Sequence, residues 1–166
     1  MLKDSIRQNF YSFLSHEEIT CLNVYFEKHN LLRLNKEIIK LVEGKDLEVS
    51  DKTFYDICHF NDALHKANKT YSDKVFVGIT EEAYNYYCKS KGKTVSHRTF
   101  SFGYTSLGDW KHYIEYTPKT AVERELLKGN VTKYLPIIFP KDRNFNVSAF
   151  NEYCIFLEEV EDGQEN

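Results

Sequence analysis

Residues that interrupt or cross-link a chain are scarce in this sequence. Its 166 residues include seven glycines, three prolines and four cysteines, the cysteines at positions 21, 58, 88 and 154. The cysteines form no CxxC motif, so we predict reduced thiols and no metal site. No apolar run approaches the roughly 20 residues that cross a bilayer, and the first residues lack the apolar core of a signal peptide. We therefore expect a cytoplasmic protein that does not contact a membrane.

Several motifs of known chemistry are also missing. The sequence has no P-loop, no GxGxxG, no GxSxG and no HExxH. Its Lys and Arg residues are scattered rather than clustered, so a nucleic-acid partner is not expected. These absences exclude the common signatures of nucleotide hydrolysis, dinucleotide-dependent reduction, ester hydrolysis and zinc-dependent proteolysis.

Aromatic residues, in contrast, are abundant: 12 Phe, 12 Tyr and 1 Trp. An apolar fraction of 42% and a charged fraction of 28% are typical of a globular chain rather than a disordered one. A length near 150 residues predicts one domain. Lys outnumbers Arg 17 to 5, a bias that is typical of a low-GC bacterium or its phage.

The net charge of −3 is divided unevenly along the chain. Residues 1–84 carry −3, residues 85–143 carry +6 and residues 144–166 carry −6. A basic middle segment favours a phosphate-bearing ligand, such as a dinucleotide or a nucleic acid. The simpler interpretation, which we prefer, is that the acidic end folds near the basic segment.

Up to about residue 70 the apolar residues follow a helical period. Three helices are predicted, one from the capping box Ser15-His16-Glu17-Glu18, one from Asn35 to Gly44 and one capped by Ser50. Their predicted inward residues are Ile19, Leu22 and Phe26 in the first, Ile38, Ile39, Leu41 and Val42 in the second, and Phe54, Ile57, Leu64 and Ala67 in the third.

After residue 70 short β-branched segments predominate. Strands are predicted at 74–79, 94–102, 112–116, 131–139 and 153–160, with a polar loop at 140–146. A helix capped by Thr80 should place Tyr84, Tyr87 and Cys88 along one side, and a short helix is predicted from Pro118 to Gly129.

This order predicts the fold class α+β, with an N-terminal helical layer followed by a mostly antiparallel, sheet-rich half. We predict a single domain over residues 1–160, made of a helical part (1–70) and a sheet-rich part (71–160). Residues 161–166 are predicted to form an acidic tail.

Three segments of the second half carry a resemblance. They are Lys74-Val75-Phe76-Val77-Gly78-Ile79, then Phe102-Gly103-Tyr104-Thr105-Ser106-Leu107, then Asn151-Glu152-Tyr153-Cys154. Their order resembles the mono-ADP-ribosyltransferase fold of bacterial toxins and phage proteins. In that family an aromatic-Arg-Gly strand, a Ser-Thr-Ser strand and a late strand with a Glu follow one another. The match covers roughly residues 55–160.

The resemblance implies NAD as the cofactor. It also implies a phage or mobile-element protein that acts on a host protein. Breaking the nicotinamide–ribose bond passes through an oxocarbenium-like state, which a nearby carboxylate stabilises. By this resemblance Glu152 is the catalytic carboxylate, and the hydroxyls of Thr105 and Ser106 position the ribose and that carboxylate.

The resemblance also implies which residues bind NAD. An Arg holds the pyrophosphate with paired hydrogen bonds in such sites, and Arg98 lies close to the second motif. Gly78 and Tyr104 belong to the first and second motifs themselves, so these three residues are the expected cofactor-binding residues.

The chain departs from the family at each motif. Val77 stands where the family has Arg, and Tyr104 takes the first of three small hydroxyl positions. A one-residue shift would put Tyr153, not Glu152, at the carboxylate position, and such a shift moves a strand side chain to the other face. The domain is therefore either active or catalytically degenerate. The alternative is that these residues have only a structural role, as ordinary strand and turn residues with Gly103 at a bulge.

An alternative function is a non-catalytic protein-binding or inhibitor module from a phage or a low-GC bacterium. Aromatic residues are enriched at binding hot spots. The tyrosines that would form such a surface are Tyr11, Tyr25, Tyr84, Tyr86, Tyr87, Tyr104, Tyr113 and Tyr116. A third possibility is a nucleotide or nucleic-acid binder that uses the basic stretch 85–143. The sequence leaves the oligomeric state open.

Overall fold

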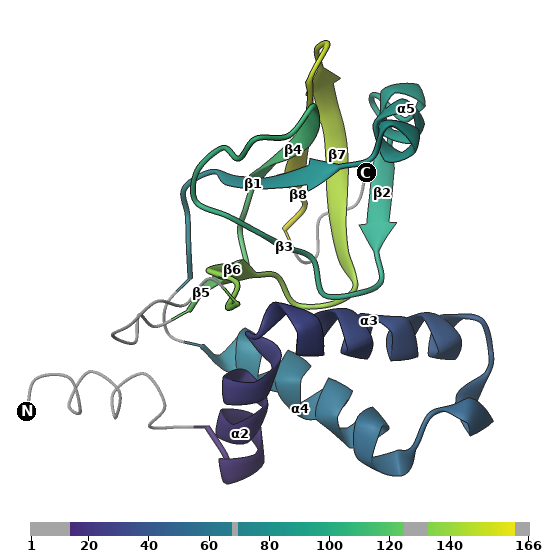
Figure 1. Cartoon of the computed structure of the whole chain (residues 1–166), viewed down its shortest axis with the longest axis vertical. Helices are drawn as coiled ribbons and strands as arrows, with labels where there is room; N and C mark the ends of the chain where they lie inside the picture. The colour runs from purple at the N-terminus through teal and green to yellow at the C-terminus, as the bar shows by residue number, and fades with distance from the viewer. Residues whose placement is uncertain (1–13, 68–69, 125–132, 162–166) are drawn as a thin grey trace, which may run out of the picture.

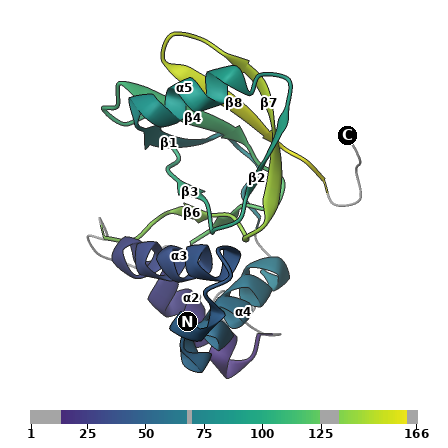
Figure 2. The ribbon, with the colours of Figure 1, turned by 90° about the vertical axis from the view of Figure 1, so that its right-hand side faces the viewer.

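The computed structural model of this chain describes residues 14–67, 70–124 and 133–161. A helical layer lies against a small sheet, which in turn lies against a larger one (Figures 1 and 2). The helices are α2 (His16–Tyr25), α3 (Lys28–Val42), the 3-10 turn η1 (Asp46–Glu48), α4 (Asp51–Lys66) and α5 (Glu81–Lys89). The strands are β1 (Val75–Ile79), β2 (Thr94–His97), β3 (Phe102–Gly103), β4 (His112–Thr117), β5 (Val122–Glu123), β6 (Ile137–Ile138), β7 (Arg143–Phe150) and β8 (Cys154–Glu159). The α+β class is confirmed.

Three of the predicted helix starts, at Ser15, Ser50 and Thr80, have the expected side-chain caps. The Ser15 hydroxyl accepts a hydrogen bond from the Glu18 N–H at 3.1 Å, and the Glu18 carboxylate accepts from the Ser15 N–H at 3.0 Å. Ser50 accepts from the Thr53 N–H at the start of α4. Helix α3 begins at Lys28 rather than at the predicted Asn35. The prediction missed this start because the N-cap residue, Glu27, makes no side-chain hydrogen bond and leaves no capping signal in the sequence.

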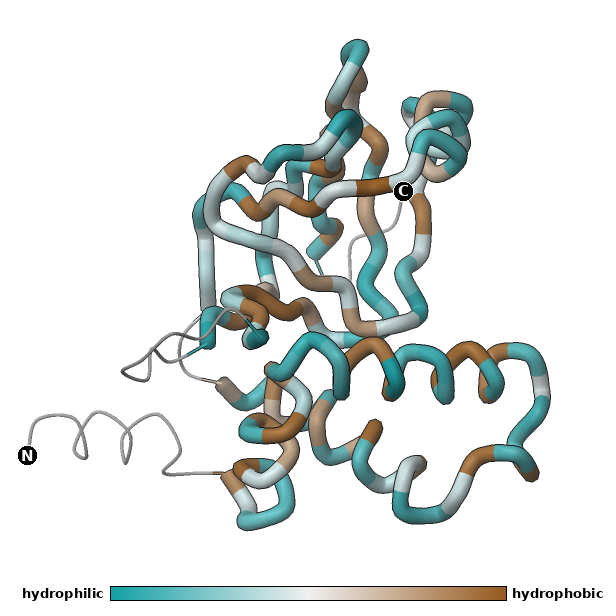
Figure 3. Tube along the Cα trace, in the orientation of Figure 1, coloured by the Kyte–Doolittle hydropathy of each residue, from teal (hydrophilic) through white to brown (hydrophobic). Residues whose placement is uncertain are grey.

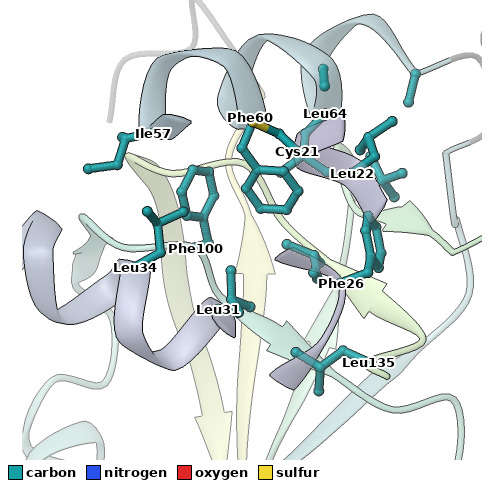
Figure 4. Close-up of a cluster of buried hydrophobic side chains, with 14 of the residues drawn as sticks. Cys21, Leu22, Phe26, Leu31, Leu34, Ile57, Phe60, Leu64, Phe100 and Leu135 are labelled. Atoms are coloured by element: carbon teal, nitrogen blue, oxygen red, sulfur yellow. The ribbon is translucent and has the colours of Figure 1, made fainter. Parts of the chain in front are cut away.

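The helices and the small sheet share one apolar core (Figure 4). The rings of Phe60 on α4 and Phe100 pack edge to face, with centroids 4.8 Å apart. The Asn35 side chain holds the Phe100 backbone, donating to its carbonyl and accepting from its N–H, both at 3.0 Å. Because Phe100 turns into the helical core, the strand predicted at 94–102 is broken into β2 and β3.

Five strands form the larger sheet in the order β1-β4-β8-β7-β2, and three form the smaller in the order β3-β6-β5. All pairs are antiparallel except β4 with β8. In β6 the alternation of a strand divides two neighbours between two cores: Ile138 packs with the helices and Ile137 with the larger sheet. Strand β6 is therefore apolar on both faces.

Three predictions for the second half are wrong. In the described part of the strand predicted at 131–139, only β6 (Ile137–Ile138) is a strand. The helix predicted from Pro118 to Gly129 is replaced in its described part by β5, where Val122 pairs with Ile138; residues 125–132 lie outside the described residues. The polar loop predicted at 140–146 ends early, because β7 begins at Arg143.

Arg143 is buried because a carboxylate faces it. Its Nε donates to Glu159 Oε2 at 2.6 Å, and the residues are only 6% and 2% exposed. Glu159 also accepts hydrogen bonds from the N–H groups of Lys119 and Thr120. A buried ion is tolerated when it is paired and hydrogen-bonded in this way. The pair thereby fixes the segment after β4 against β7 and β8.

Removing one partner of the Arg143–Glu159 pair should strongly destabilise the folded protein. We expect Arg143→Met to lower the free energy of unfolding by about 3–5 kcal/mol, because Glu159 is left buried without its cation. Lys52→Met, which breaks the Lys52–Asp56 pair whose Lys52 side chain is 85% exposed, should cost less than about 1 kcal/mol. Urea denaturation of both variants measures the difference, and equal losses would contradict the structural role of the buried pair.

Candidate functional site

The two sheets meet where an edge strand of each comes together. The Phe76 N–H donates to the Tyr104 carbonyl at 2.8 Å, and the Tyr104 N–H donates to the Phe76 carbonyl at 2.7 Å. This contact requires glycine at position 103, since a Cβ there would lie 2.5 Å from Val75 Cγ1 and 2.8 Å from the Phe76 carbonyl oxygen. The expected bulge glycine is thus a point of close backbone approach between β1 and β3.

Two cavities flank this junction, and both are lined by Val77, Gly78 and Phe102. The first, which we call the tryptophan cavity, has a volume of about 420 Å³ and is also lined by Trp110, Tyr104, Ser106 and Lys28. The second, the histidine cavity, measures about 400 Å³ and is also lined by His97, Tyr87, Ser101 and Tyr116. Each volume falls in the range of small-molecule sites.

Trp110 forms one wall of the tryptophan cavity and depends on two glycines. A Cβ at Gly78 would lie 2.3 Å from Trp110 Cδ1, and one at Gly108 would lie 2.7 Å from its Cζ2. The Tyr104 ring lies 5.9 Å from the indole, centroid to centroid. With Ser106 and Lys28 on the same lining, the cavity offers an aromatic surface, a hydroxyl and a cation.

A short chain of hydrogen bonds crosses the histidine cavity. His97 Nδ1 lies 2.8 Å from Ser101 Oγ, and its Nε2 lies 2.9 Å from the Tyr87 hydroxyl. Desolvation lowers the pKa of His97 to about 4, so its ring is neutral near pH 7. Burial raises the pKa of Tyr87 to about 12 and raises that of the fully enclosed Tyr116 as well. The network is therefore a set of neutral hydrogen-bonding groups.

Three of the residues predicted for the site line the tryptophan cavity: Ser106, Gly78 and Tyr104. Thr105 is exposed and lines neither cavity. Arg98 lines the histidine cavity, but its Nε donates to Asp142 Oδ1 at 2.7 Å.

Asp142 itself has a left-handed backbone, with φ of 59°. Burial opposes its charge, but hydrogen bonds from Lys141 and Arg98 outweigh that effect and lower the pKa of Asp142. The structure thus ties Arg98 to Asp142 at the edge of the cavity.

Glu152 lies away from both cavities, in the three-residue turn between β7 and β8. The Asn151 carboxamide oxygen accepts hydrogen bonds from the N–H groups of Tyr153 and Cys154, each at 2.9 Å, and shapes this turn. The Tyr113 N–H donates to the Tyr153 carbonyl, which extends the β4–β8 ladder by one residue. Tyr153 therefore has the strand parity of buried Ile155, and Glu152 has the opposite one. Glu152 and Ser106 do not line a common cavity.

Sequence reasoning missed four residues of the site: Trp110, Lys28, His97 and Tyr87. The signal for Trp110 was available, because the chain's one tryptophan follows Gly108 within the second motif's loop. No sequence motif marked Lys28, because it lies at the start of α3, where no capping residue marks the helix. His97 in β2 and Tyr87 in α5 become partners only because α5 packs against the larger sheet at β4 and β8.

Among the described residues, no group of His, Cys, Asp and Glu side chains could hold a metal ion. The described helices include none that combines the length and apolarity required to span a bilayer.

Comparison with known proteins places this geometry in a class. No family model and no curated protein sequence matches the chain. Solved structures of C3-like mono-ADP-ribosyltransferase toxins do match it over most of its length, so the fold is that of these toxins. The resemblance drawn from the three motifs is thereby confirmed for the fold.

Three structures illustrate the likeness. The C3 exoenzyme of Clostridium limosum has a TM-score of 0.66 at 12% identity, covering 95% of this chain and 91% of that one. The type III effector XopAI of Xanthomonas axonopodis pv. citri has a TM-score of 0.70 at 12% identity, covering 97% and 74%. The ADP-ribosylating toxin BECa of C. perfringens, in a structure with NADH, has a TM-score of 0.65 at 14% identity, covering 92% and 46%.

Replacing Gly78 should disturb the wall of the tryptophan cavity. We expect Gly78→Ala to displace the indole, shift the emission of this sole tryptophan to longer wavelength and lower stability by about 1–3 kcal/mol. Gly44→Ala is the control: Gly44 has positive φ, but a Cβ there would have no neighbour within 4 Å. It should lower stability without changing the emission, and unchanged emission in Gly78→Ala would contradict the packing.

His97 should make the protein sensitive to acid. Its folded-state pKa of about 4 lies below the ordinary 6.5, so the unfolded chain binds a proton that the folded chain does not. The contribution of His97 to the free energy of unfolding is fully present above pH 6.5 and is lost as the pH drops toward 4. The loss amounts to about 2 kcal/mol at pH 5. In His97→Gln the stability measured by denaturation should fall less steeply over this range. Identical slopes in the two proteins would refute the assignment.

Proposed function

We propose that this chain is a catalytically degenerate ADP-ribosyltransferase-like domain that binds NAD or a similar nucleotide without transferring ADP-ribose. One observation carries the proposal. The β1–β3 junction retains an aromatic, hydroxyl- and lysine-lined cavity, while the position of the family's Arg holds Val77, whose side chain packs with the core between the sheets.

The tryptophan cavity fits parts of a nucleotide. Aromatic side chains such as Trp110 and Tyr104 provide flat surfaces for a base. Ser106 can hydrogen-bond a ribose hydroxyl, and Lys28 supplies a cation for a phosphate. These residues bind and orient a nucleotide but supply no carboxylate.

Among the described residues, neither cavity is lined by a carboxylate of the kind that the chemistry needs. Cleaving the nicotinamide–ribose bond develops positive charge on the ribose, which a carboxylate must face. Val77 carries no charge, and Glu152 is exposed in a turn and lines neither cavity. Tyr153, which shares the strand parity of the inward-facing residues, carries a phenol and not a carboxylate. The described residues that line the two cavities therefore support binding rather than transfer.

A protein partner is the second part of the proposal. Of the tyrosines considered above, Tyr11 lies outside the described residues, and only Tyr86 is among the exposed large hydrophobic residues. Most of these tyrosines are therefore half-buried and form no exposed patch. The observation that favours a partner is a set of exposed aliphatic and aromatic side chains on the helical layer. An origin in a phage or low-GC bacterium, and a target in its host, stay predictions from composition and resemblance.

Titration with NAD should quench the fluorescence of Trp110. We expect Ser106→Ala and Lys28→Glu each to weaken this binding about tenfold, as the loss of one polar or charged contact does. Thr105→Ala is the matched control, because Thr105 neighbours Ser106 but does not line the cavity. No quenching, or equal weakening by Thr105→Ala and Ser106→Ala, would contradict nucleotide binding at this place.

The same protein should transfer nothing. Incubation with NAD labelled on its adenylate and with cell lysate should label no protein and release no nicotinamide above the buffer control. Label transfer that disappears in Glu152→Gln would instead establish an active transferase and would overturn the degenerate assignment.

A further inference from the structure

Some residues predicted to be buried in the helical layer are exposed. Ile39, Val42 and Phe54 were expected to face inward, yet they are 47%, 50% and 46% exposed. Leu47 and Tyr55 beside them in sequence are 103% and 60% exposed. These residues come from the end of α3, from η1 and from the start of α4, and apolar stretches mark this end of the layer in Figure 3. An apolar cluster of this kind on a surface indicates an interaction site.

The exposed residues border a groove. Toward this end α3 and α4 separate (Figure 1). A cavity of about 260 Å³ lies there, lined by Ile38, Leu41 and Val42 from α3 and by Phe54, Ile57 and Cys58 from α4. We call it the α3–α4 groove. Its lining is apolar along both helices, and Arg98, Lys141 and Asp142 line its remaining part.

Negative charge is in excess beside the groove, in the connection between α3 and α4. Among the described residues no cation pairs with Asp46, Glu48 or Asp51, and Lys45 is already paired with Glu43 at 3.2 Å. The connection therefore presents three uncompensated carboxylates next to the apolar lining.

We propose that the α3–α4 groove is a docking site for a basic amphipathic helix of a partner protein. An apolar groove between two helices accepts the apolar stripe of a third helix, with anchors at i, i+3, i+4 and i+7. Lys or Arg residues beside that stripe would face Asp46, Glu48 and Asp51, which steers the approach and selects the partner. An anionic membrane surface would be repelled by the same carboxylates. This docking does not depend on nucleotide binding at the β1–β3 junction.

The test uses the full chain and two synthetic peptides of about four helical turns. One peptide has Leu at the i, i+3, i+4 and i+7 positions and Lys elsewhere, and the other has Glu in place of Lys. In amide NMR spectra the Lys peptide should shift signals of residues 38–58 and of Arg98, Lys141 and Asp142, which line the rest of the groove, and the Glu peptide should shift none. Shifts confined to other residues, or none with either peptide, would overturn the proposal.

Two variants test the apolar contact. Val42→Glu and Phe54→Glu should each weaken binding of the Lys peptide at least about tenfold. The added carboxylate would strengthen a purely electrostatic attraction, so a loss reports the apolar contact. Leu32→Glu is the matched control, because Leu32 is 41% exposed on the same helix and does not line the groove. The Leu32→Glu variant should bind the Lys peptide as tightly as the unchanged protein does. A loss of affinity equal to that of Val42→Glu would refute the site.

Two further measurements separate the alternatives. The triple variant Asp46→Asn, Glu48→Gln, Asp51→Asn should bind the Lys peptide several-fold more weakly and with a smaller dependence on salt; unchanged binding would contradict the charge argument. In sedimentation experiments without peptide, the chain should not form a dimer through this groove, which would be a dimer that the Val42→Glu substitution dissociates. Such a dimer would mean that a second copy, rather than a partner helix, occupies the groove. Ser106→Ala should leave peptide binding unchanged, which keeps this result separate from that of nucleotide binding.

Discussion

The close approach of β1 and β3 at Gly103 is the constraint on which the rest of the structure depends. Two hydrogen bonds between Phe76 and Tyr104 join the edge strands of the two sheets, and they form only because no side chain separates the backbones at position 103. The junction sets the separation of the sheets and thereby creates the cavity on either side of it. It also places Val77 on the lining of both cavities. At that shared position Val77 gives both cavities an apolar, uncharged surface.

Helix α3 connects the two surfaces for which we propose functions. Its first residue, Lys28, lines the tryptophan cavity, and its last, Val42, lines the α3–α4 groove. Between them Asn35 holds the backbone of Phe100, whose ring fills the helical core. The helix spans about 22 Å from end to end at the usual rise per residue. A nucleotide and a partner helix could therefore be bound at once, at opposite ends of one rigid element.

Local signals in the sequence predicted local structure well. The Ser15 and Ser50 caps and the β-branched run of β1 correspond to elements in the structure, because a capping side chain or a strand period acts within a few residues. Helix α3 was placed too late because no cap marks its start. The predictions that failed depend on distant partners: Arg143 is strand because Glu159 neutralises it, and Val122 is strand because Ile138 pairs with it.

The site was predictable only in part. The first motif pointed to Gly78 and the second to Tyr104 and Ser106, and all three line one cavity because strands β1 and β3 come together there. Arg98 is diverted by Asp142, which lies 44 residues away, and no spacing could show that. The position of Glu152 depended on a register that a turn of three residues sets. Exposure of Val42 and Phe54 was missed because periodicity identifies an apolar face, not the element that covers it.

The most direct test of nucleotide binding without transfer is a crystal structure of the chain grown with NAD. The account predicts an intact dinucleotide at the β1–β3 junction, with a ring against Trp110, a phosphate near Lys28 and no carboxylate within hydrogen-bonding distance of the nicotinamide ribose. A dinucleotide bound elsewhere, or Glu152 in contact with that ribose, would contradict it.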